Sequence, residues 1–349
     1  PNIKVEVVGI PWSETTGQLT IRAAGGTAPD VALVNGGDPA IFAAMGALEP
    51  VEGLVPQETV DSMQWAKAAL IDIPSYQGVQ YGLTWYVFTF PLIYNKVAME
   101  AAGLDPANPP ATWDEFESAL VQVGKAGNDL YGLGGDFTQG SWGGRFFYRW
   151  LWAYGADVLD SEGNIAFDSP EAIAALEALI KLYRENDHAI TFGIGTYDAR
   201  EVFARDKVAF LNEAAWMRSI LRDLSGKGEA YDASWGVAPW PSDYTYISSH
   251  AWVIFKQSKH KEEAAKFINF VVSNRDMQEL WAEVFGSIPP QQEYQDFELF
   301  QDAYYTEFLA GLKNGRGEIS HPQGELIASS VAVAVQEALS GVAEPADAL

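Results

Sequence analysis

The chain has 349 residues, the length of about two domains, and 48% of its residues are hydrophobic, which is enough to fill a core in each. Its 22 Lys and Arg stand against 47 Asp and Glu, and the net charge of −25 excludes a general binder of nucleic-acid phosphates and argues against adhesion to anionic membranes. Cysteine is absent, so disulfides, thiolate catalysis and cysteine-ligated metals are excluded.

The first segments of the chain alternate between strand and helix patterns. Period-two alternation predicts a strand over Ile3–Val8, and helical spacing follows over about Ser13–Ala24. Asp30–Val34 predicts a short buried strand, which ends in the turn Asn35–Pro39. The order strand, helix, strand predicts a right-handed parallel unit. The turn at Asn35–Pro39 is then at a carboxyl edge, where open α/β sheets bind their ligands.

Helix-start signals recur further along the chain. Thr112 and Glu115 form a capping box, in which each side chain bonds the other residue's backbone N–H. Further helices are predicted to begin at Ser169, at Ser258 and at about Gln323, the last ending near Leu339.

No flexible linker separates two domains in this sequence. We find no repeat, no low-complexity tract and no segment rich in Pro and Ser. Two lobes without such a linker are expected to be joined by several ordered crossings. Two extended segments, Tyr81–Phe88 and Tyr246–Phe255, are the candidates.

Eight short motifs, in fixed order and spacing, point to one family. They are Ala28-Pro29-Asp30-Val31, Met45–Pro50, Tyr81–Tyr86, Tyr94-Asn95-Lys96, Thr112–Phe116, Phe167–Ala172, Ser258-Lys259 ahead of Glu263-Ala264, and Gly286–Pro289. Over almost its whole length the chain resembles the extracellular solute-binding proteins of sugar ABC importers, the maltose-binding-protein-like group. The resemblance implies a periplasmic-binding-protein-like fold of type II, with two α/β lobes and a ligand cleft between them. We expect a mainly parallel sheet flanked by helices in each lobe.

The resemblance also implies that both lobes are discontinuous in sequence. The N-terminal lobe is expected to hold 1–87 and 248–290, and the C-terminal lobe 92–244 and 291–349. The crossings are expected near 85–92, 245–250 and 288–293. Family members usually begin with a strand, a loop and a helix ahead of the segment matching Pro1–Val8, and these are missing here.

The function implied is capture of a small carbohydrate or carbohydrate-derived solute and its delivery to the permease of an ABC importer by hinge closure. We expect a monomer with no enzymatic activity, no cofactor and no metal. The expected location is the periplasm, or the outer surface with a membrane anchor if the source is Gram-positive. Pro1 is not a natural start, so an upstream targeting segment can have been removed.

Two alternatives stay open at this stage. A polyamine or other cationic solute could be held by carboxylates and aromatic faces through cation–π contacts. A glycoside hydrolase would also combine aromatic subsites with a pair of carboxylates, although no motif supports it. A thermal-shift panel of sugars, sugar acids and polyamines, and an assay for released reducing sugar, separate the three.

Aromatic residues are the strongest candidates for ligand contact, since the chain has 12 Trp, 15 Tyr and 18 Phe. Sugar rings present apolar C–H faces that stack on flat aromatic surfaces. Trp85 and Tyr86 lie on the first crossing, Trp142 lies beside a predicted helix start, and Trp216 matches the segment where the family places a stacking Trp. A core role is expected for Trp12, Trp65, Trp113 and Trp281.

The polar candidates are few. Asn35, Gly37 and Asp38 lie in the turn after the second predicted strand, where a carboxylate can bind vicinal hydroxyls and Gly lets the backbone approach. Arg145 could grip the anion of an acidic sugar, or could form a surface ion pair.

Three further residues are singled out by the family pattern. Ser249 and His250 stand where the family often has Gly-Gly, and Gln323 lies where its final helix begins. The four histidines show no pair at metal-ligand spacing.

Overall fold

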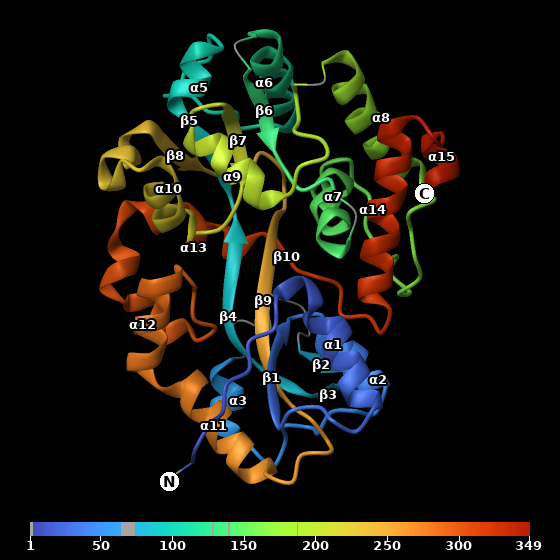
Figure 1. Cartoon of the computed structure of the whole chain (residues 1–349), viewed down its shortest axis with the longest axis vertical. Coiled ribbons are helices and arrows are strands. Elements are labelled where there is room, and N and C mark those ends of the chain that lie inside the picture. Colours follow the sequence, from blue (N-terminus) through green and yellow to red (C-terminus); the bar gives the residue numbers. More distant parts are fainter. Residues whose placement is uncertain (1–2, 64–73, 128, 139, 187) are drawn as a thin grey trace. The chain divides into compact units, whose positions relative to one another are not determined.

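The computed structural model describes residues 3–63, 74–127, 129–138, 140–186 and 188–349 (Figure 1). The chain divides into two compact units. Unit 1 consists of Pro1–Phe88, Ile247–Thr306 and Arg316–Gly324, and unit 2 consists of Thr89–Tyr246, Glu307–Gly315 and Glu325–Leu349. In the described part of the chain, no helix is long and apolar enough to cross a membrane.

Two of the unit boundaries lie inside long strands. One follows Phe88 in β4 (Gly82–Phe90) and another follows Tyr246 in β9 (Thr245–Ile254). The two segments predicted to be extended are therefore strands. Later boundaries differ from the expected single crossing near 288–293, since they follow Thr306, Gly315 and Gly324.

Unit 1 combines short strands with helices. Its helices are α1 (Trp12–Ala24), α2 (Asp38–Ala44), α3 (Gln57–Ser62), α11 (Lys261–Ser273) and α12 (Arg275–Phe285), followed by the 3-10 turns Gln292–Asp296, Glu298–Gln301 and Ala303–Tyr305. Its strands are β1 (Val31–Asn35), β2 (Ser75–Tyr76) and β3 (Val79–Gln80). β9 pairs with β1, with β4 and with β10 (Gly315–Arg316), which gives a four-stranded sheet.

The predicted parallel unit at the start of the chain is wrong. Residues 3–11 form no strand, and their valines are open to solvent, with Val5, Val7 and Val8 exposed by 43%, 87% and 64%. β1 instead runs antiparallel to β9, which places Asn35 opposite His250. An alternating pattern needs a partner strand for its backbone groups, and Ile3–Val8 has none among the described residues.

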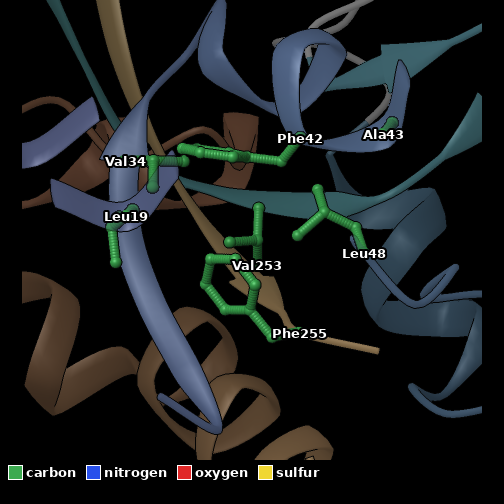
Figure 2. Close-up of a cluster of buried hydrophobic side chains, with 7 residues drawn as sticks. All are labelled: Leu19, Val34, Phe42, Ala43, Leu48, Val253 and Phe255. Carbon is green, nitrogen blue, oxygen red and sulfur yellow. The ribbon is translucent and has the colours of Figure 1, made fainter. Parts of the chain in front are cut away.

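The core of unit 1 is drawn from segments far apart in the sequence (Figure 2). Leu19 of α1 and Phe42 of α2 meet Val34 of β1, and Val253 and Phe255, from a much later segment of the chain, complete the cluster. These five side chains are at most 1% exposed. Burial of this kind contributes about 1.5–3 kcal/mol for each large apolar side chain, so this cluster fixes α1 and α2 against the sheet.

Unit 2 is richer in helix. Its helices are α5 (Lys96–Ala101), α6 (Trp113–Lys125), α7 (Ser141–Ala153), α8 (Pro170–Glu185), α9 (Thr196–Ala204), α10 (Met217–Ser225), α14 (Gly324–Ser340) and α15 (Pro345–Ala348), with α13 (Thr306–Ala310) and the 3-10 turns Gly228–Ser234 and Gly311–Lys313. Its strands are β5 (Leu92–Asn95), β6 (Tyr131–Gly134), β7 (Val208–Asn212) and β8 (Trp235–Ala238), in the order β6-β7-β5-β8.

The strand directions differ from the expected mainly parallel sheets. β6 and β7 are parallel, but β5 runs antiparallel to both β7 and β8. Together with the antiparallel pair of β1 and β9, the named pairs are mostly antiparallel. Apolar periodicity identifies a strand but carries no information on which distant strand it pairs with, or in which direction.

The helix starts follow local chemistry. The Thr112 and Glu115 capping box is present, and Ser169 caps α8 by accepting a hydrogen bond from Ala172 N at 3.2 Å. α11 begins at Lys261, later than the predicted Ser258. The Ser258 hydroxyl instead donates to Asp30 Oδ1 at 2.6 Å and accepts from His260 N, which holds a turn ahead of the helix.

Candidate functional site

The turn after β1 places its carboxylate inside unit 1. Asp38 opens α2 and is fully buried. Its Oδ2 accepts a hydrogen bond from Thr16 Oγ1 at 2.8 Å and another from Asn35 Nδ2 at 3.3 Å. The side chain therefore ties α1 to the end of β1. The predicted ligand contact of Asn35 and Asp38 stays a prediction.

Gly37 is enclosed by the segment that precedes α14. Its backbone N–H donates to Glu318 Oε2 at 3.4 Å, and Ser248 Oγ donates to the other oxygen of the same carboxylate at 3.2 Å. A Cβ at position 37 would lie 2.8 Å from the carbonyl oxygen of Ile319. Only glycine fits this contact without a shift of the backbone. Gly37 thus allows two backbone segments of unit 1 to approach each other closely.

Trp85 and Tyr86 lie in an aromatic cluster of unit 1. Their side chains are 7% and 1% exposed. Trp85 stacks on Trp281, with 4.7 Å between ring centroids, and lies 5.4 Å from Trp252. Burial raises the pKa of Tyr86 above its ordinary value, so this hydroxyl stays protonated. Contact of these two residues with a ligand stays a prediction.

His250 connects this cluster to the start of α1. Its Nδ1 lies 2.7 Å from the Tyr86 hydroxyl, and its ring stacks on Trp12 at 4.3 Å between centroids. Burial lowers the pKa of His250 to about 3, which keeps the ring neutral at physiological pH. Ser249, the next candidate, is 2% exposed, and its hydroxyl has no partner among the described residues.

The prediction that Trp12 belongs to the core is wrong, because its side chain is 44% exposed. Trp113 and Trp281 are half-buried, and Trp65 lies outside the described residues. Gln323 is exposed, and its backbone N–H donates to His321 Nδ1 at 3.0 Å.

Trp216 occupies a defined position in unit 2. It follows β7 at the start of α10 and is half-buried. Its Nε1 donates to Glu213 Oε2 at 3.1 Å, and that carboxylate accepts two hydrogen bonds from Arg200, at 2.7 and 3.0 Å. The arginine and glutamate side chains are only 10% and 5% exposed. Burial acts against the charge of Arg200, but the Glu213 carboxylate outweighs this and raises the arginine pKa.

The pair of Arg200 and Glu213 thus holds the indole at its polar edge. A bidentate arginine–carboxylate pair has a fixed planar geometry, so it restricts the rotation of anything bonded to it. The guanidinium carbon also lies 5.8 Å from the Trp216 ring centroid.

A narrow hollow of unit 2 adjoins this arrangement. Trp142, Glu213, Asn212 and Asp136 line it. Trp142 and Trp216 both contact the Phe90 ring, with 6.1 and 5.7 Å between centroids, so two of the predicted aromatic contacts come together here.

Asp136 is occupied by hydrogen bonds within unit 2. Its Oδ1 accepts from the backbone and hydroxyl of Thr138, and its Oδ2 accepts from the hydroxyl of Thr196 at 3.0 Å. This carboxylate fastens the segment after β6 to the start of α9.

Arg145 is paired within unit 2. It is 8% exposed, donates to Glu325 of α14 as an ion pair, and donates to Ser141 Oγ at 3.1 Å. The preceding residue, Gly144, lets α7 approach α14, because a Cβ there would lie 1.8 Å from the carbonyl oxygen of Ala328. The carboxylate of Glu325 neutralises the charge of Arg145. Binding of an anionic ligand by Arg145 stays a prediction.

Arg149 is a buried residue that the sequence analysis did not select. It donates from Nε to Asn212 Oδ1 and from Nη1 to the Arg145 carbonyl oxygen at 2.9 Å. Its guanidinium carbon lies 4.3 Å from the Tyr246 ring centroid, and burial lowers its pKa to about 10. It remains charged at neutral pH and fixes the Asn212 side chain beside the hollow.

Arg200 and Glu213 were also missed, although the sequence carries a signal for both. Glu213 directly follows the buried strand Val208–Asn212. A charge at such a position is shielded from water, so it is costly unless it is paired with an opposite charge. Arg200 lies on the apolar side of α9, next to Ala199 and three residues before Phe203. A charged residue at a core position of each element indicates a buried pair.

Comparison with known proteins decides the family. Residues 1–278 match the family model described as bacterial extracellular solute-binding protein. The chain belongs to this family. The resemblance stated from the sequence motifs is thereby confirmed.

Solved structures of similar fold agree with this membership. An ABC transporter solute-binding protein of Thermotoga lettingae, bound with alpha-D-tagatose, is 27% identical, with a TM-score of 0.81 over 97% of this chain and 86% of its own. Maltose-bound MalE3 of T. maritima is 25% identical, with a TM-score of 0.82 over 100% of this chain and 90% of its own. The fold is that of type II periplasmic binding proteins, and two units of mixed helix and sheet confirm the predicted fold class.

A relative of known sequence matches almost the whole of this chain. A protein of Brucella abortus (strain 2308), named as a binding protein, is 26% identical over 99% of this chain and 83% of its own length. Family and neighbours are binding proteins of transporters.

Proposed function

We propose that this protein captures a small neutral carbohydrate and delivers it to the permease of an ABC importer. The observation that carries the proposal is the similarity, over 97% of the chain, to a solute-binding protein that holds alpha-D-tagatose. The protein acts as a monomer without chemistry on its ligand, in the periplasm or anchored at the outer surface of a cell.

The aromatic geometry of unit 2 supports a carbohydrate ligand. Trp216 is oriented through its Nε1 by Glu213, and a flat indole ring is the kind of surface on which the C–H face of a sugar stacks. Trp142 lines the adjoining hollow with polar groups beside it. An aromatic wall with a few fixed polar groups is the usual design of a small-molecule site.

The charged groups of unit 2 support a neutral ligand. Arg145 is paired with Glu325, and Arg200 with Glu213. Asp136 accepts hydrogen bonds from Thr138 and Thr196. A sugar acid or a polyamine would have to compete with these internal partners for its counter-charge, whereas sugar hydroxyls add hydrogen bonds without breaking an ion pair.

A thermal-shift panel followed by calorimetry tests this function. The panel contains D-tagatose, maltose, glucuronate and spermidine, at concentrations that reach 100 times the dissociation constant. A ligand of the folded state then adds about 2.7 kcal/mol to the free energy of unfolding. We expect this from a neutral sugar. Stabilisation by spermidine alone would move the assignment to a polyamine-binding protein.

The same samples test for catalysis. Purified protein is incubated with oligosaccharides, and released reducing sugar is measured over time. We expect none above the rate in buffer. Release at a rate proportional to protein concentration would mean that the protein is a glycoside hydrolase.

A further inference from the structure

Trp12, the first residue of α1, is an exposed aromatic side chain with a rigid backing in unit 1. Its side chain is 44% exposed. One face is covered by His250, at 4.3 Å between centroids with 15° between the ring planes. A large indole left open to water forgoes much of its hydrophobic stabilisation, and covering it with an apolar ligand surface would recover part of that stabilisation.

The backing ring is held from behind. His250 Nδ1 lies 2.7 Å from the Tyr86 hydroxyl, and Tyr86 is 1% exposed. Phe88 meets the edge of the same imidazole at 6.0 Å between centroids. The stack of Trp12 on His250 is therefore anchored in the interior of unit 1 and does not depend on a mobile surface partner.

Polar groups lie at the same end of the sheet. Asn35 is opposite His250 in the antiparallel pair of β1 and β9. The Asn35 amide donates to Asp38, which also accepts from Thr16, one turn along α1 from Trp12. The first turns of α1 thus bring an open aromatic face and the polar end of β1 into one region of unit 1.

We propose that Trp12 is a ligand-binding residue of unit 1, and that its exposed ring packs on the apolar C–H face of a neutral sugar ring. His250 is a positioning residue, which acts through Trp12 by fixing the plane of the indole. The inference rests on the proposed carbohydrate-binding function and adds a residue and a ligand feature, a flat apolar ring face, to it. The fixed plane means that little rotamer entropy is lost when the sugar binds.

The test compares Trp12→Ala and Trp12→Phe with Phe270→Ala, an exposed aromatic of α11 that is 54% exposed and serves as the matched control. Calorimetry with D-tagatose and with maltose gives the dissociation constants. We expect Trp12→Ala to raise the constant for the bound sugar by about tenfold or more, as truncation of a central aromatic contact does, whereas Trp12→Phe keeps most of the affinity. Phe270→Ala leaves it unchanged.

The role of His250 is tested by a double-mutant cycle. If His250 acts through Trp12, His250→Ala weakens sugar binding in the wild-type background and has no further effect in Trp12→Ala. Equal effects in both backgrounds overturn the positioning role.

The outcomes separate this inference from the function on which it rests. If the wild-type protein binds a sugar and Trp12→Ala binds it as tightly, the inference about Trp12 is overturned and the proposed function stands. If the wild-type protein binds neither sugar in the calorimeter, both are overturned.

Discussion

The indole of Trp216 is held by its polar edge, and this decides what its removal does. We expect Trp216→Ala to abolish measurable carbohydrate affinity. The half-buried ring contributes less to stability than a core aromatic, so the free energy of unfolding falls by well under the roughly 3–5 kcal/mol lost when a fully buried Trp is truncated. Calorimetry and urea denaturation of the ligand-free protein measure the two effects.

The matched control for Trp216 is Phe270→Ala, which removes an aromatic that is 54% exposed on α11 of unit 1. It is expected to bind carbohydrate like the wild type. A stability loss in Trp216→Ala as large as that of a core residue, with affinity retained, would contradict the binding role.

His250 couples stability to pH. Its folded-state pKa of about 3 lies below the ordinary 6.5, so the unfolded chain binds the extra proton and stability is lost as the pH falls below about 6.5. At 1.36 kcal/mol for each pKa unit, protonation of this side chain in the unfolded chain lowers the free energy of unfolding by about 2 kcal/mol between pH 7 and pH 5.

We expect His250→Gln to lose about 2 kcal/mol less than the wild type over this interval, measured by urea denaturation at both pH values. Gln cannot titrate, so the comparison isolates this ring from the carboxylates that titrate at lower pH. Parallel losses in the two proteins would show that His250 is protonated in the folded state.

Among the elements, α7 and α14 approach each other at a glycine. Gly144→Ala places a Cβ 1.8 Å from the Ala328 carbonyl oxygen, so the helices must separate. We expect a loss of at least the roughly 1–3 kcal/mol typical of overpacking, measured by thermal denaturation. The Arg145–Glu325 ion pair joins the same helices and is weakened with them.

The control is Gly17→Ala in α1, where nothing lies within 4 Å of the added Cβ. Alanine is the better helix former by roughly 0.5–1 kcal/mol, so this variant is expected to be more stable than the wild type. Destabilisation by both substitutions to the same extent would mean that the close approach at Gly144 is not responsible.

Features set by neighbouring residues could be predicted from the sequence, and features set by distant ones could not. The Thr112 capping box and the Ser169 cap involve atoms within one helical turn, and both formed. The Ile3–Val8 pattern is just as clear, but a strand also requires a partner that alternation does not specify. A core role is expected for Trp12 because aromatic rings usually fill cores, whereas its observed position is against His250, over 200 residues away in the chain.

For the whole molecule, the net charge of −25 opposes compaction. Repulsion among exposed carboxylates extends over about 30 Å at 0.01 M salt and about 8 Å at 0.15 M. We therefore expect the melting temperature of the ligand-free protein to rise between these salt concentrations, in scanning calorimetry with NaCl and with KCl alike. The buried Arg200–Glu213 pair is shielded from solvent ions and does not offset this gain. A melting temperature that falls with salt would mean that surface attractions outweigh the repulsion.

Because both units are discontinuous in sequence, each can finish folding only after its last segment has been synthesised. A ribosome adds residues from the N-terminus, and unit 1 needs Arg316–Gly324 while unit 2 needs Glu325–Leu349. The carboxylate of Glu318, which accepts hydrogen bonds from Gly37 and Ser248, is synthesised 281 residues after Gly37. Neither unit can therefore complete its packing before these late segments are made, and apolar segments made earlier stay exposed to aggregation until then.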